Sequence, residues 1–191
     1  MSHYYYFAAT LPTLQFGVAA PMSSADFLER CAHFLAGSEL LAIQSAVLVS
    51  TSAGAPAACL GVSPLLDGYY VWERSFRASL AKVRASRLGR AFPEPAAAAD
   101  EGAAITARTV AQAASPLEGE LAIERERWAK IDSFLDYDRF GFEAIAAYRL
   151  HLLALERLAS LEAGRGEQGY AAVYAAILDA ANTIDLTGDL R

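Results

Sequence analysis

Three histidines, His3, His33 and His151, are the side chains of this sequence best suited to carrying protons or binding metal ions. None of them stands in an HExxH pattern or beside a cysteine at the spacing of a zinc site. Histidine as a class is neither strongly buried nor strongly exposed. We therefore expect His33 and His151 to be ordinary surface or hydrogen-bonded residues, and we predict no metal site.

The segment LEGELAIERERW, residues 117–128, has the density of carboxylates that acid–base catalysis or a di-metal centre would need. Helical di-metal centres use a Glu-x-x-His motif on two helices and further glutamates on the others. The chain contains no Glu-x-x-His. These carboxylates are therefore predicted to form a solvated helix face.

Other signatures of catalysis and cofactor binding are also missing from the sequence. It has no GxSxG nucleophile motif. The predicted loop from Val49 to Pro64 contains glycines, but no GK[ST] follows it as in a phosphate-binding loop. The C-terminal stretch IDLTGDLR lacks the ligand spacing of a calcium-binding loop. We predict no catalytic residue and no cofactor.

Glu124 is the exception among the carboxylates, because it lies on an apolar stripe between Leu121 and Trp128. Buried charges are normally paired. We expect Glu124 to form a buried ion pair with an arginine, and Arg84 and Arg149 are the candidates for the countercharge.

The predicted helix from Leu66 to Leu88 is strongly basic. Six basic residues from Arg74 to Arg90 accompany a single acidic one, Glu73, and the candidate interface residues are Arg74, Arg77, Arg84 and Arg87. Three interpretations are open: pairing with the acidic helix around residues 118–136, docking of an acidic protein partner, and RNA binding. No aromatic residues interleave with the basic face as a base-stacking platform would require.

Apolar residues recur at helical spacing along most of the chain, and no convincing run of alternating residues predicts a strand. We predict an all-α fold, an antiparallel bundle of about six helices. The YYYFA segment, Tyr4–Ala8, is left open as a short extended alternative. Its rings, Tyr4, Tyr5, Tyr6 and Phe7, are expected to pack into the body of the fold.

Composition sets the remaining limits. The 191 residues, 54% of them hydrophobic, suit a single helical domain, 1–191, with a possible subdivision near residues 92–102. The net charge of −6 and the pI of about 5.1 argue against general nucleic-acid binding. No secretory signal or apolar run of membrane-spanning length is apparent, so we expect a cytoplasmic protein.

Three stretches carry a family resemblance: the opening YYYFAATLPTLQFG, the helix YYVWERSFRASLAKVRASRLGR, and WAKIDSFLDYDRFGFEAIAAYRLHLLALERLASLEAGRG in the C-terminal half. With SSADFLERC, they resemble a bacterial family of unassigned function encoded within V-type ATP synthase operons, at the place where the gene of the C-type stalk component would be expected.

The resemblance implies a C-like, or d-like, component of a rotary ATPase. Such components are helical and non-catalytic, and they join the central stalk to the membrane rotor ring, so they attach to the membrane only peripherally through the complex. True members of the C type are longer and contain three related helical units. An assembly factor for the ATPase therefore remains an alternative.

A stand-alone helical-bundle enzyme is the alternative of a different class. It would require a pocket in which titratable groups converge, and the sequence offers Glu124, Arg84, Arg149 and His151 for it.

Overall fold

The computed structural model describes residues 4–49, 55–92, 101–135, 140–161 and 173–178. Within them the chain is helical and contains no strand, which confirms the predicted all-α bundle. The elements are α1 (Tyr4–Thr10), α2 (Ser24–Phe34), α3 (Gly37–Ser45), a 3₁₀ turn η1 (Ala57–Cys59), α4 (Pro64–Arg87), α5 (Glu101–Ala111), α6 (Pro116–Phe134) and α7 (Phe142–Ser160).

The chain divides into two compact units, Met1–Glu156 and Arg157–Arg191. All of the elements from α1 to α6 and most of α7 belong to the first unit. In the second unit, residues 173–178 are helical, and its other residues from 162 onward lie outside the described ones. The predicted subdivision near residues 92–102 falls mostly on residues 93–100, which are also outside them.

Polar residues set the starts of the longer helices. Ser63 and Ser115 each accept a hydrogen bond from the backbone three residues later, and each is followed by a proline at the first helical position of α4 or α6. Proline suits this position because its missing N–H would have no partner there. Ser23 forms a reciprocal capping box with Asp26 at the start of α2.

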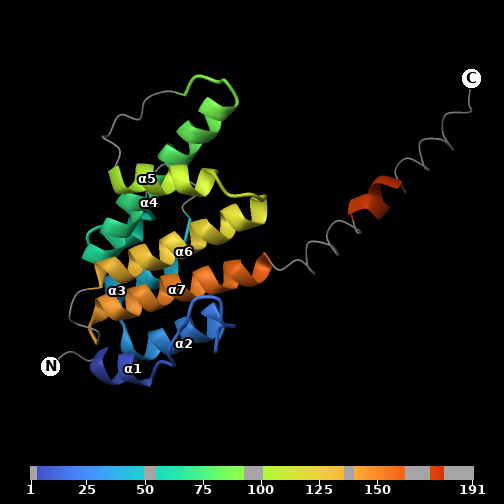
Figure 1. Cartoon of the computed structure of the whole chain (residues 1–191). Coiled ribbons are helices and arrows are strands. Elements are labelled where there is room, and N and C mark those ends of the chain that lie inside the picture. Colours follow the sequence, from blue (N-terminus) through green and yellow to red (C-terminus); the bar gives the residue numbers. More distant parts are fainter. Residues whose placement is uncertain (1–3, 50–54, 93–100, 136–139, 162–172, 179–191) are drawn as a thin grey trace, which may run out of the picture. The chain divides into compact units, whose positions relative to one another are not determined.

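In the first unit, α6 and α7 run side by side, with α1 and α2 on one side of them and α5 with the end of α4 on the other (Figure 1). α7 is buried over most of its circumference, as expected for the wide apolar coverage of its sequence. The core includes Phe27 of α2, Tyr69 and Phe76 of α4, and Ile145 and Leu150 of α7, all of them essentially inaccessible to solvent.

Two carboxylates fix α7 to its neighbours at both ends. Glu143 accepts hydrogen bonds from the Ser63 hydroxyl at 2.6 Å and from the backbone N–H of Leu65 at 3.1 Å, at the start of α4. Glu156 accepts two bonds of 2.7 Å from Ser24 at the start of α2. Because the N-terminus of a helix carries a partial positive charge and free N–H groups, a carboxylate is favourable there.

The N-terminal aromatic segment is helical rather than extended, and it buries only part of its rings. Phe7 is 1% exposed and stacks on Phe34, with ring centroids 4.7 Å apart. Tyr4 is partly buried and donates a hydrogen bond to Glu39. Tyr5 and Tyr6, by contrast, are 60% and 70% exposed. A seven-residue helix turns only one side to the core, so the expectation that all four rings pack inside is wrong for these two.

Candidate partner interface

The C-terminal part of α4 and the residues after it form a basic, projecting end of the first unit (Figure 1). The four predicted interface residues, Arg74, Arg77, Arg84 and Arg87, are all exposed. They are spaced by three and seven residues, which places them on one side of the helix. Beyond Leu80 no residue of α4 is fully buried, because the helix has passed the core.

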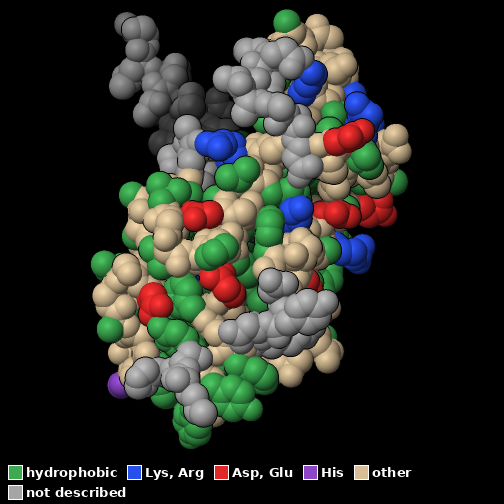
Figure 2. Space-filling model, turned by 90° about the vertical axis from the view of Figure 1, so that its left-hand side faces the viewer, with side chains coloured by type: hydrophobic (Ala, Val, Ile, Leu, Met, Phe, Trp, Pro, Cys, Tyr) green, Lys and Arg blue, Asp and Glu red, His purple; other side chains and the backbone are tan. Residues whose placement is uncertain are grey.

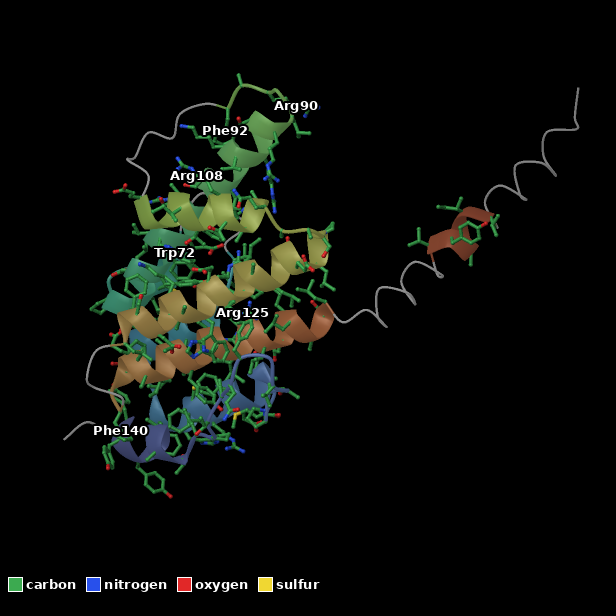
Figure 3. All side chains as sticks on the ribbon, viewed as in Figure 1. Trp72, Arg90, Phe92, Arg108, Arg125 and Phe140 are labelled. Atoms are coloured by element: carbon green, nitrogen blue, oxygen red, sulfur yellow. The ribbon has the colours of Figure 1, made fainter. Side chains whose placement is uncertain are left out.

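Apolar side chains lie among these arginines. Leu88 is 70% exposed, and Phe92 is also exposed. Arg90 and Phe92 lie at the same end of the molecule as Arg108 of α5 (Figure 3). On the face drawn in Figure 2, the Lys and Arg side chains lie toward this end, and none lies toward α1. Arginine and aromatic residues are the types most enriched at binding hot spots.

Two of these arginines, Arg84 and Arg87, make contacts with other helices of the same fold. The Arg84 guanidinium is 4.0 Å from the carboxylate of Glu120 on α6, and Arg87 donates to the carbonyl of Ala111 at the end of α5. The internal-pairing interpretation therefore holds for Arg84. Arg74 and Arg90 are exposed, and no carboxylate among the described residues is seen to pair with either of them.

Glu73, the acidic residue among these arginines, faces the core instead of neutralising the surface. Arg127 of α6 donates two hydrogen bonds to it, at 3.1 and 2.7 Å, and a further bond to Glu124. The three side chains are 5% exposed or less. Burial by itself would lower the pKa of Arg127, but the hydrogen bonds and charge of Glu73 and the charge of Glu124 outweigh it and raise the pKa.

Glu124 is thus buried beside an arginine, but that arginine is Arg127, not Arg84 or Arg149. The reason for the difference is geometric: Arg127 follows Glu124 by three residues on α6 and so lies on the same side of the helix. Sequence reasoning missed both Arg127 and Glu73. The signal for Glu73 was present, since it falls four residues after Tyr69 and three before Phe76 on the core face of α4.

Arg149 is buried on α7, away from the Glu73–Arg127–Glu124 cluster. Its Nε and Nη1 have no hydrogen-bond partner among the described residues. Burial lowers the pKa of Arg149, and the negative charge of Glu156 partly offsets this effect. The other electrostatic neighbours of Arg149 are Cys31 and Tyr70.

Both cysteines, Cys31 and Cys59, are buried free thiols, and burial raises the pKa of Cys31 to about 12.

The two cavities lined by described residues do not bring together the four residues that the enzyme alternative would need. Arg84 lines a cavity of about 290 Å³ with Arg87 and Glu120, between α4 and the start of α6. His151 lines another of about 330 Å³, and neither lining includes Glu124 or Arg149. Within the described residues no three histidine, cysteine or acidic side chains cluster as a metal site would require.

Comparison with known proteins yields no relative: no protein-family model, no curated protein and no solved structure matches this chain. The family resemblance of the sequence therefore stays a prediction. Among the described residues, no helix has the length and apolar character needed to cross a lipid bilayer.

Proposed function

We propose that this protein is a non-catalytic interaction subunit that binds an acidic surface of a protein partner through the basic end of α4. The observation that carries the proposal is the placement of charge on this helix. Arg74, Arg77, Arg84 and Arg87 are exposed, while Glu73 is buried and accepts two hydrogen bonds from Arg127. The helix therefore presents positive charge on a protein of net charge −6. Such local fields steer association with an oppositely charged partner.

The resemblance to proteins of V-type ATP synthase operons supplies the first partner to test. We propose the role of a C-like component, associated with a V/A-type ATP synthase, that couples the central stalk to the membrane rotor ring. An all-α body with a projecting, charged helix end is compatible with such a role. In this proposal the protein reaches the membrane only through its partners.

The test is affinity purification of the tagged full-length protein from detergent-solubilised native membranes, with the recovered subunits identified by mass spectrometry. A double variant, Arg74→Glu with Arg90→Glu, reverses two exposed charges for which no pairing carboxylate is seen among the described residues. The matched control is Arg30→Glu, which reverses an exposed charge on α2. Proteins of the stalk and ring should copurify with the native protein and the control, and be lost with the double variant.

Binding that depends on these charges should also weaken with salt, because screening at about 1 M ionic strength shortens the Debye length to roughly 3 Å. Recovery of an intact ATPase that lacks this protein would contradict the stalk role. Copurification with partly assembled subcomplexes alone would indicate the assembly factor instead. Equal recovery by the double variant and the native protein would show that the α4 surface is not the interface.

A further inference from the structure

A cavity of about 330 Å³ lies between the segment around the end of α1 and the helices α6 and α7. Leu11 and Leu14 of the segment after α1, Trp128 and Asp132 of α6, and Tyr148 and His151 of α7 are among the residues that line it. Ligand pockets are typically apolar cavities with a few convergent polar groups, of roughly 300 Å³ or more. This cavity, here called the His151 cavity, has that composition and the lower limit of that size.

Trp128, which lines the His151 cavity, is held in place by two other rings. The His151 ring stacks on Trp128, with centroids 3.9 Å apart and an angle of 17° between the planes. Phe16 packs edge-on against Trp128 at 5.7 Å. A flat wall of this kind suits the apolar body of a small ligand, because stacking needs no rearrangement of the rings.

Two acceptors of the cavity face each other without a hydrogen bond between them. Nε2 of His151 is 3.5 Å from Oδ1 of Asp132, and it has no hydrogen-bond partner among the described residues. The hydrogen bond of this ring to the backbone of Trp128 therefore belongs to Nδ1. Burial lowers the pKa of His151, against the opposing effect of Asp132, so at neutral pH the ring is uncharged and Nε2 is an acceptor.

The residues that line the cavity carry charge of one sign only. Among the described residues that line it, Asp132 is the only carboxylate, and none is a lysine or an arginine. Two cations lie outside this lining: Arg125 is placed over the ring of Phe16, and Arg30 acts on Tyr148. The Asp132 side chain is 52% exposed, so it lies at the solvent edge and can turn to admit a donor between itself and His151.

We infer that the His151 cavity binds a small primary amine with an apolar body. The ammonium group donates one N–H to Asp132 and another to Nε2 of His151, while the apolar part lies between Trp128 and the leucines after α1. A cationic donor fits because it supplies hydrogens to two acceptors at once and carries the charge opposite to Asp132. Buried polar atoms without a partner are uncommon in folded proteins, and this ligand satisfies one of them.

The experiment is calorimetric titration of the full-length protein with 2-phenylethylamine, with 2-phenylethanol and 3-phenylpropanoate as neutral and anionic probes of similar shape. We expect saturable binding of the amine with one site per chain, and markedly weaker binding of the other two. Asp132→Asn should weaken amine binding by about tenfold or more, because a hydrogen bond between charged groups is lost. Ala144→Leu fills the cavity from its half-exposed edge and should abolish binding.

Glu126→Gln is the matched control, since it removes the same charge from an exposed position of α6 that does not line the cavity. It should bind the amine as the native protein does. The inference is overturned if the amine does not saturate the protein, if Asp132→Asn binds it as tightly as the native protein, or if the alcohol binds equally well. Thermal unfolding of each variant, compared with the native protein, verifies that it is folded.

Discussion

Arg127 on α6 donates two hydrogen bonds to Glu73 on α4, from Nε to Oε2 and from Nη2 to Oε1. Both side chains are almost completely buried. The same guanidinium also reaches Glu124. This places one positive and two negative groups at the contact between two helices, out of reach of water. Such a cluster stabilises the fold only while every member keeps its partner, because the cost of removing charges from water is large.

Replacing Arg127 by methionine should therefore destabilise the protein by roughly 3–5 kcal/mol, because two buried carboxylates lose the guanidinium that they share. Urea unfolding monitored by circular dichroism measures this loss. Arg74→Met, at an exposed position of α4, is the control and should change stability by no more than about 0.5 kcal/mol.

A triple variant, Glu73→Gln, Glu124→Gln and Arg127→Met, separates the charge effect from packing. It should recover much of the stability lost in Arg127→Met, since neutral side chains avoid the penalty of unpaired buried charge. A triple variant that is even less stable than the single one would contradict this account and indicate that shape, rather than charge, dominates at this contact.

The helices were predictable because their signals are local. Serine and proline at the starts of α4 and α6, and apolar residues spaced by three and four, are sufficient to place these elements. The burial of Glu124 was predictable on the same basis. Its partner was not, because which arginine turns inward depends on the packing of α6 against α4, and periodicity along one helix does not determine this.

The conformation of α1 also depends on tertiary packing that local sequence preferences do not determine. A run of tyrosine and phenylalanine favours strands in general, but this segment has no neighbouring strand among the described residues and is helical. Packing of Phe7 between the helices decides its conformation, as tertiary contacts often override local preference. The His151 cavity was likewise not predictable from the sequence, because its lining brings residues 8–14 together with residues 128–151, which lie far from them in the chain.

The stability of the protein should fall as the pH drops through the range where histidine titrates. His151 has a folded-state pKa below its ordinary value of 6.5, and burial is the main cause. Below about pH 6.5 the unfolded chain therefore binds a proton that the folded one does not, and the free energy of unfolding decreases until the lower folded-state pKa is reached. Above that range the contribution is fully present.

His151→Gln should remove this component. The change in the free energy of unfolding between about pH 7.5 and about pH 5.5, measured in urea, should be smaller in His151→Gln than in the native protein. His33→Gln, which alters an exposed histidine, serves as the reference variant. Identical profiles for native protein and His151→Gln would show that His151 does not resist protonation in the fold.

The two sides of α1 should differ sharply in their effect on stability. Phe7 packs on both Phe27 and Phe34, and its removal leaves a cavity in the core. Phe7→Ala should cost about 3–5 kcal/mol, whereas Tyr6→Ala, at a mostly exposed ring, should cost less than about 1 kcal/mol. Similar melting temperatures for the two variants would mean that α1 does not dock as described.

Ser63 is expected to matter more than an ordinary helix cap. Its hydroxyl accepts the backbone N–H of Leu66 at 3.1 Å and donates to Glu143 at 2.6 Å, so one buried group both begins α4 and fixes α7 to it. Ser63→Ala removes the cap and a hydrogen bond to a carboxylate, a loss of roughly 2–4 kcal/mol. Ser115→Ala removes only the cap of α6, on a partly exposed residue, and should cost about 1 kcal/mol. Urea unfolding of the two variants measures the difference, and equal losses would show that the bond between Ser63 and Glu143 adds nothing to the cap.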